Sequence, residues 1–168
     1  MSQHFAINPK TDLVFERFID APKRLVWEAL TKPEHLKEWY MPKAWGTVLR
    51  CEMDVRPGGI FSVDIAVANG PEVPNVGCFL DVVPMERLAW TSMLFPGYRP
   101  ATFDDVPITA IITIETAGSG TRYVFTALHR DEADLEKNKT SGWQQGTEIA
   151  LDQLVAHVNS MKQVKATR

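Results

Sequence analysis

The sequence contains few cysteines and no long apolar run, and these absences exclude several classes of protein. Its two cysteines, Cys51 and Cys78, show no CxxC spacing and have no third partner, so a disulfide framework is not expected. No run of about 18 apolar residues is present, which argues against a membrane-spanning helix. The first residues lack a basic start followed by an apolar stretch, so we expect no signal peptide and a cytoplasmic protein.

The charge balance is mildly acidic, with 18 Lys and Arg against 21 Asp and Glu and a net charge of −3. The longest basic cluster is the pair Lys23-Arg24, and nucleic-acid binders usually carry a basic patch, so we expect no nucleic-acid partner. The length of 168 residues and the 45% apolar content fit one globular domain over residues 1–168. A barrel of eight strand–helix units needs more chain.

Hydrophobic periodicity predicts a strand at 12–20, followed by two short helices. Asp20 is the expected cap of a first helix over 22–30, because aspartate readily accepts hydrogen bonds from the first turn. Thr31 is the expected cap of the second helix, with Pro33 in its first turn, where proline is tolerated.

Beyond Gly46 the period changes to two, which indicates strands. Leu49, Cys51, Met53 and Val55 alternate with charged residues, and the turn sequence at 56–59 introduces a hairpin. Further strands are predicted at 61–67, 76–83, 88–94, 108–115 and 122–128, which makes seven strands in a mostly hairpin-connected, antiparallel sheet. A long amphipathic helix beginning at 131–134, and interruptible near Gly142 or Gly146, completes an α+β chain.

Five strings in this order resemble one known group of proteins: FERFIDAPKRLVWEALTKPEHLKEWY at 15–40, VRPGGIFSVDI at 55–65, VGCFLDVVPMERLAWT at 76–91, LHRDEAD at 128–134 and ALDQLVAHV at 150–158. They are similar to the START/polyketide-cyclase-like (SRPBCC) superfamily, and more narrowly to the activator of heat-shock-protein-90 ATPase homologue-like domain family. The resemblance implies a helix-grip fold, in which a seven-stranded curved antiparallel sheet wraps around a long C-terminal helix and leaves an internal cavity.

Two departures limit what the resemblance implies. Similar sequences usually carry Gly-Trp before the pair that is here Leu151-Asp152, whereas Thr147 follows Gly146 in this chain, so the cavity shape near Thr147 is expected to differ. The eukaryotic co-chaperone also has a separate N-terminal domain that contacts the chaperone. No counterpart is expected before a first strand that begins at about residue 12, so the chaperone-activating role does not transfer by name alone.

The polar run from His129 to Asp134 has the residue types of metal ligation or acid–base chemistry. A metal site needs three or more converging ligands, and we favour a strand end followed by Asp131 as a helix cap. Gly118-Ser119-Gly120 lacks the third glycine of a dinucleotide-binding motif and is interpreted as a hairpin turn. Cys51 and Cys78 lie among apolar neighbours and are interpreted as core residues rather than nucleophiles. No cofactor or metal is expected.

Aromatic residues at inward strand positions and around the short helices predict an apolar ligand cavity. The expected ligand-binding residues are Trp39, Tyr40, Trp45, Phe61, Val63, Trp90, Ser92, Phe95, Tyr98, Arg99, Ile112, Phe125, Trp143, Gln144, Thr147 and Leu151. The hypothesis is binding of a small hydrophobic or aromatic ligand between the sheet and the last helix.

Two alternatives stay open at this point. The first is a cyclase, dehydratase or hydrolase acting on a polyketide-like or other apolar substrate. It ranks second because no acid–base pair falls on inward positions, and no catalytic residue is named. The second is a stress-response or chaperone-interacting module, which predicts an exposed apolar patch instead of a cavity. The loop at 96–107 leaves room for a homodimer.

Overall fold

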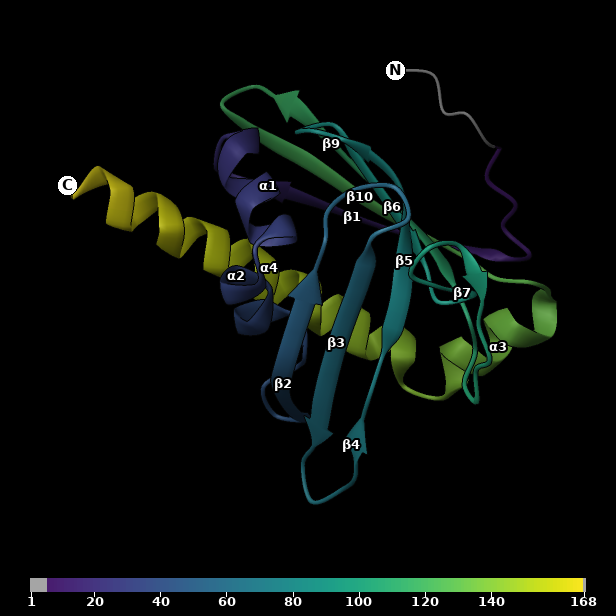
Figure 1. Ribbon diagram of the computed structural model, residues 1–168. Helices are drawn as coiled ribbons and strands as arrows, with labels where there is room; N and C mark the ends of the chain where they lie inside the picture. The colour runs from purple at the N-terminus through teal and green to yellow at the C-terminus, as the bar shows by residue number, and fades with distance from the viewer. Residues whose placement is uncertain (1–5, 168) are drawn as a thin grey trace.

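The computed structural model describes residues 6–167, which contain ten strands and four helices; Figure 1 shows how they are arranged. The strands are β1 Asp12–Ile19, β2 Gly46–Met53, β3 Ile60–Val67, β4 Glu72–Val73, β5 Val76–Val83, β6 Arg87–Thr91, β7 Leu94–Phe95, β8 Arg99–Pro100, β9 Thr109–Ala117 and β10 Gly120–Leu128. The helices are α1 Lys23–Thr31, α2 Pro33–Trp39, α3 Glu132–Thr140 and α4 Trp143–Ala166.

One antiparallel sheet forms the body of the molecule, in the order β1-β10-β9-β6-β5-β3-β2. The short strand β4 adds to β3, and β7 pairs with β8 in a separate two-stranded ribbon. The sheet curves, and the long helix α4 crosses it with α1 and α2 packed alongside (Figure 1). This arrangement confirms the α+β helix-grip fold with seven main strands and a long C-terminal helix.

Both short helices form where the sequence predicts them, but neither predicted cap is used. The N-cap of α1 is Pro22, whose side chain has no acceptor for a cap bond, and the Asp20 carboxylate pairs with Lys162 on α4 at 3.5 Å instead. Thr31 is the last residue of α1, and its hydroxyl donates to the carbonyl oxygen of Trp27 at 2.6 Å. The helices share Lys32 as C-cap and N-cap, which leaves no position for Thr31 as a cap.

A bulge in β2 corrects the predicted facing of one residue. The pairing of β2 with β3 shifts between Val48 and Arg50, and an extra residue in one strand reverses which side chains face the core. Leu49 is therefore 38% exposed, although simple alternation places it inward. Val48, Cys51 and Met53 pack against the core instead.

The predicted C-terminal helix is two helices, and its break lies at Gly142. Asp131 caps α3 as expected, its side chain accepting a hydrogen bond from the backbone N–H of Asp134 at 2.9 Å. Gly142 has φ of 91°, a left-handed conformation that favours glycine over any residue with a Cβ. The chain can therefore turn there, and α4 begins at Trp143 along a new axis.

The cysteines lie on strands that another strand separates. Cys51 is on β2 and Cys78 on β5, with β3 between them, and both thiols are free. Cys78 is fully buried. Burial also raises the pKa of the Cys51 thiol to about 11, which disfavours the thiolate that nucleophilic chemistry requires.

Candidate functional site

A cavity of about 460 Å³ lies between the concave face of the sheet, α4 and the segment that runs from α2 into β2. Its volume is within the range of about 300–1,000 Å³ typical of small-molecule sites. The cavity is lined by Leu30, Leu36, Trp39, Tyr40, Met41, Pro42, Trp45, Phe61, Ile65, Val73, Asn75, Phe79, Leu88, Trp90, Asp105, Ile108, Ile112, Tyr123, Phe125, Ser141, Gly142, Trp143, Gly146, Thr147, Ala150 and Leu151.

Cross-strand pairs explain how the sheet supplies one wall. Directly opposed residues of an antiparallel pair share a face, and the pairs Phe125–Ile112 and Ile112–Leu88 place three lining residues in one row. In the next row Trp90 lies opposite Ala110. The sheet therefore presents the aromatic rings of Trp90 and Phe125 to the cavity beside aliphatic side chains.

Small residues on α4 keep the opposite wall open. Gly146, Thr147 and Ala150 line the cavity, and the Thr147 hydroxyl is occupied by a hydrogen bond to the carbonyl oxygen of Trp143 at 2.9 Å. A Cβ on Gly146 would lie 2.7 Å from Cζ3 of Trp45, which is closer than side-chain carbons normally approach. The indole of Trp45 therefore packs directly on the helix backbone, and glycine is what permits this contact.

The third wall, the link between α2 and β2, is fastened to α4 by one glutamine. The side-chain amide of Gln153 donates to the carbonyl oxygens of Trp39 and Met41, each at 2.9 Å. Its side-chain oxygen accepts from the backbone N–H of Lys43 at 3.0 Å. These three bonds tie a link that lies outside the helices and strands to α4, so Gln153 positions lining residues without being one of them.

An arginine fastens the same helix to the edge strand β1. Arg17 lies opposite Tyr123 in the sheet, and its guanidinium donates to Asp152 at 3.0 Å and to the carboxylate of Glu148. Hydrogen bonds to these carboxylates raise the pKa of Arg17. The pairing also means that this positive charge is already neutralised and is not offered to the cavity.

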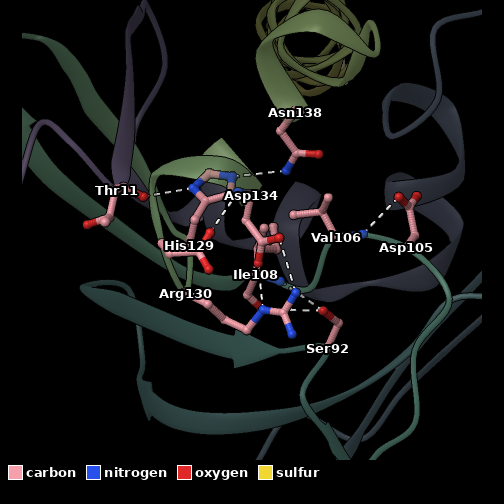
Figure 2. A network of polar contacts seen from close by, with 10 residues as sticks. Thr11, Ser92, Asp105, Val106, Ile108, His129, Arg130, Asp134 and Asn138 are labelled. Atoms are coloured by element: carbon pink, nitrogen blue, oxygen red, sulfur yellow. Dashed lines mark hydrogen bonds and ion pairs between the residues drawn. The ribbon is translucent and has the colours of Figure 1, made fainter. Parts of the chain in front are cut away.

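His129, the candidate in the polar run before α3, is a buried structural residue. Figure 2 shows its ring held between Thr11 and Asn138. Its Nδ1 lies 2.8 Å from the carbonyl oxygen of Thr11, and its Nε2 lies 2.9 Å from the amide nitrogen of Asn138. A carbonyl only accepts, so Nδ1 carries the proton and Nε2 accepts from the amide. Both nitrogens are occupied, which leaves none for a metal or a substrate.

The structure brings ten of the sixteen sequence-predicted site residues to the cavity. They are Trp39, Tyr40, Trp45, Phe61, Trp90, Ile112, Phe125, Trp143, Thr147 and Leu151. The six that lie outside its lining are Val63, Ser92, Phe95, Tyr98, Arg99 and Gln144.

Each outlying residue has a structural reason for its position. Val63 is buried in the core, and the Ser92 hydroxyl accepts from the backbone N–H of Ile108 at 3.0 Å. Phe95 and Arg99 pair across the exposed β7–β8 ribbon, with Tyr98 at its turn. Gln144 lies in the first turn of α4, next to a lining residue but not among the lining residues.

The lining residues that sequence reasoning missed are mostly small or aliphatic. They include Met41 and Pro42 in the link after α2, Phe79 on β5, and Gly146 and Ala150 on α4. Helical spacing places Ala150 on the apolar face of the last helix, so its inward position is predictable from the sequence. The open space that Ala150 borders could not be predicted from the sequence.

The cavity contains little charge. Asp105 is the one ionisable acid among the lining residues, which include no Lys, Arg or His, and its carboxylate accepts from the backbone N–H of Val106 at 2.8 Å (Figure 2). Residues 6–167 contain no group of three or more His, Cys, Asp or Glu placed to hold a metal ion. Within the same residues, no helix combines the length and the apolar character needed to cross a membrane.

Comparisons with known proteins agree with this architecture. A family model described as "Activator of Hsp90 ATPase homolog 1-like protein" matches residues 20–159. A crystal structure of a protein from Nitrosomonas europaea is 37% identical, covers 94% of this chain and 99% of that chain, and superposes with a TM-score of 0.88. One from Chromobacterium violaceum is 27% identical, covers 88% and 96% of the two chains, and gives a TM-score of 0.67.

More distant structures share the fold alone. A protein from Rhodobacter sphaeroides is 17% identical, covers 92% of this chain and 97% of that chain, and superposes with a TM-score of 0.78. No curated protein matches the chain.

Proposed function

The chain belongs to the family of Activator of Hsp90 ATPase homolog 1-like proteins, and on that premise we propose that it binds a small, largely apolar ligand in the cavity between the sheet and α4. The observation that carries the proposal is the cavity of about 460 Å³. A folded chain of this size normally fills its interior to the density of an organic crystal. An aromatic-lined space of this volume is a feature of proteins that hold a small molecule.

The arrangement of the walls supports reversible binding. Contacts outside the cavity hold α4 in place, because Gln153 bonds it to the α2–β2 link and Arg17 bonds it to the edge strand β1. The lining side chains are therefore free to contact a ligand without losing a structural partner. Burial of apolar ligand surface then supplies affinity at about 25 cal/mol per Å² before the costs of association.

Acid–base catalysis has less support than binding. The lining residues include no histidine and one carboxylate, Asp105, which is bonded to the backbone of Val106. The two lining tyrosines are protonated at neutral pH, because burial raises the pKa of Tyr40 to about 12 and raises that of Tyr123 as well. A general base suited to neutral pH is not present among these groups.

The first test is native mass spectrometry of protein purified gently from its own host. We expect an excess mass that disappears on denaturation. Two matched variants, Ala150→Phe and Ala156→Phe, show whether the bound molecule lies in the cavity. Ala150 lines the cavity, and Ala156 lies exposed on the same helix. The excess mass should be lost from Ala150→Phe and kept in Ala156→Phe.

A fluorescence titration with N-phenyl-1-naphthylamine, a neutral dye that brightens in apolar surroundings, tests the same pair without the natural ligand. Binding to the wild type and to Ala156→Phe, with loss in Ala150→Phe, is the expected pattern. If the wild type carries no excess mass and does not bind the dye, or if Ala150→Phe binds as the wild type does, the cavity is not a ligand site.

A further inference from the structure

Two tyrosine side chains line the cavity with hydroxyl groups that have no hydrogen-bond partner in residues 6–167. Tyr123, on β10, is 1% exposed and is among the largest fully buried side chains. Tyr40, at the end of α2, is partly buried and packs against Phe61 and Trp39. Three other lining groups differ from these, because the Trp39 indole N–H, the Thr147 hydroxyl and the Asp105 carboxylate all bond to backbone atoms.

The Tyr123 hydroxyl must open onto the cavity. Every side-chain nitrogen or oxygen that is completely enclosed within the described residues has a hydrogen-bond partner. The Tyr123 hydroxyl has no partner, so it is not completely enclosed, and the space that this buried residue borders is the cavity. Buried polar groups are paired with protein or with water in the great majority of native structures, so a ligand that takes the place of water beside this hydroxyl loses affinity unless it provides an acceptor.

The charges around the two phenols define the kind of partner. Burial raises both pKa values, so each group is a neutral O–H donor near pH 7. The guanidinium of Arg17, which lies opposite Tyr123 in the sheet, is engaged by Glu148 and Asp152. An anionic ligand would therefore lose its hydration without gaining a free counter-charge, which is costly in an apolar site.

We propose that the ligand is a neutral oxygenated compound, such as an aromatic or alicyclic ketone, whose oxygen accepts a hydrogen bond from the Tyr123 hydroxyl, with Tyr40 as a second polar contact. This inference rests on the proposed function and narrows it from apolar ligands in general. A site whose buried donor requires a partner rejects an isosteric compound that lacks the acceptor. The two tyrosines thereby act as specificity-determining residues.

The test uses three compounds of the same ring system, measured by displacement of N-phenyl-1-naphthylamine at pH 8. These are 2-acetylnaphthalene, which has a carbonyl acceptor, 2-isopropenylnaphthalene, which has the same shape without the oxygen, and 2-naphthoate, which is anionic. For the wild type we expect the ketone to bind about 3- to 10-fold more tightly than the alkene, the range of one net hydrogen bond. The carboxylate should bind at least about tenfold more weakly than the ketone.

The variants Tyr123→Phe and Tyr40→Phe remove one hydroxyl each and keep the ring. Tyr123→Phe should bring the ketone-to-alkene ratio to about one by weakening the ketone alone, and Tyr40→Phe should lower it in the same direction by less. The alkene serves as the internal control, because its affinity should not fall in either variant. The urea midpoint of the ligand-free protein should also stay unchanged, since neither hydroxyl has a protein partner to lose.

The outcomes separate this inference from the proposal it rests on. If the wild type binds the ketone and the alkene equally, or if Tyr123→Phe keeps the wild-type ratio, the cavity binds apolar ligands without the hydrogen bond inferred here. Tighter binding of the carboxylate than of the ketone would overturn the proposal that the ligand is neutral. Failure of all three compounds and of the dye to bind the wild type would overturn the proposed function itself.

Discussion

Replacing Ala150 by leucine should make the ligand-free protein more stable. Ala150 is buried on α4 and its side chain borders the cavity. Leucine adds three carbon atoms, and each buried methylene contributes about 0.8 kcal/mol, which gives about 2.4 kcal/mol in total. Ordering the leucine side chain costs about 0.5–1 kcal/mol, and the two residues differ little in helix propensity. The expected gain in unfolding free energy is therefore about 1.5 kcal/mol.

In a filled interior, the same substitution would lower the free energy of unfolding instead of raising it. Forcing extra methylenes into a well-packed core costs about 1–3 kcal/mol, so the sign of the change reports whether the space is empty. The cavity volume of about 460 Å³ leaves room for the added atoms. The variant should also bind N-phenyl-1-naphthylamine more weakly, because the leucine occupies part of the same space.

Urea unfolding, followed by circular dichroism, measures the effect. The protein is first unfolded and refolded to remove any bound ligand, because a ligand that stays bound to the native state stabilises the wild type. With a urea m-value of about 2 kcal/mol/M, the midpoint should rise by about 0.5–1 M. Ala156→Leu, on the exposed side of α4, is the control and should change little. A midpoint that falls for Ala150→Leu would refute the presence of an open cavity at this position.

Three further predictions follow from individual contacts. Gly146→Ala should displace the Trp45 indole, which lies 2.7 Å from the position of the new Cβ. The native tryptophan emission and the dye affinity should then both change, and constancy of both would contradict the contact. Burial and charge repulsion between His35 and His157 lower the pKa of His157. The folded state therefore binds fewer protons than the unfolded state near pH 6, and stability falls as pH drops through about 6.5. Comparison of urea midpoints at pH 7.5 and 5.5 should show this loss in the wild type and a smaller loss in His157→Gln, whereas equal losses would rule out the histidine pair as its source. The pKa of Cys51, raised to about 11 by burial, leaves about one thousandth of the thiol as thiolate at pH 8, so its reaction with a disulfide reagent should be far slower in the folded protein than in urea.

The sheet was predictable because its signals are local and repeated. The strand at 76–83 has the same bounds in the structure as in the sequence prediction, since turn residues on both sides limit an apolar run. Leu49 could not be placed correctly, because the bulge beside it depends on how β2 and β3 fit together rather than on either strand alone. The predicted cap at Thr31 failed for a similar reason, because the shared residue Lys32 joins the two helices without a gap.

The aromatic part of the cavity was predictable and its empty part was not. Phe61, Trp90 and Phe125 have inward positions on strands, which periodicity reveals. An open space also depends on where side chains are small. Small residues such as Gly146 and Ala150 occur both where a helix borders a cavity and where it packs closely against another element, so the sequence does not distinguish these two cases. Helical spacing groups Gln153 with the polar residues of the last helix, but its side chain bonds the α2–β2 link. Such a contact depends on a segment that lies about 110 residues away.

The pairing of the first strand with the last strand has a consequence for how the chain folds. β1 pairs along its length with β10, and the Thr121 hydroxyl donates to the carbonyl oxygen of Ala21, 100 residues earlier in the chain. The chain must lose the conformational entropy of closing this long loop before the contacts between β1 and β10 can stabilise it. Folding should therefore be slow for a chain of this size, in the range of milliseconds to seconds. On the ribosome, β1 waits roughly 5–20 s for its partner at the usual rate of synthesis. During that interval the side chains of Phe15 and Ile19, which the folded protein buries, lie on an unpaired strand, so this part of the core forms only after β10 has been made.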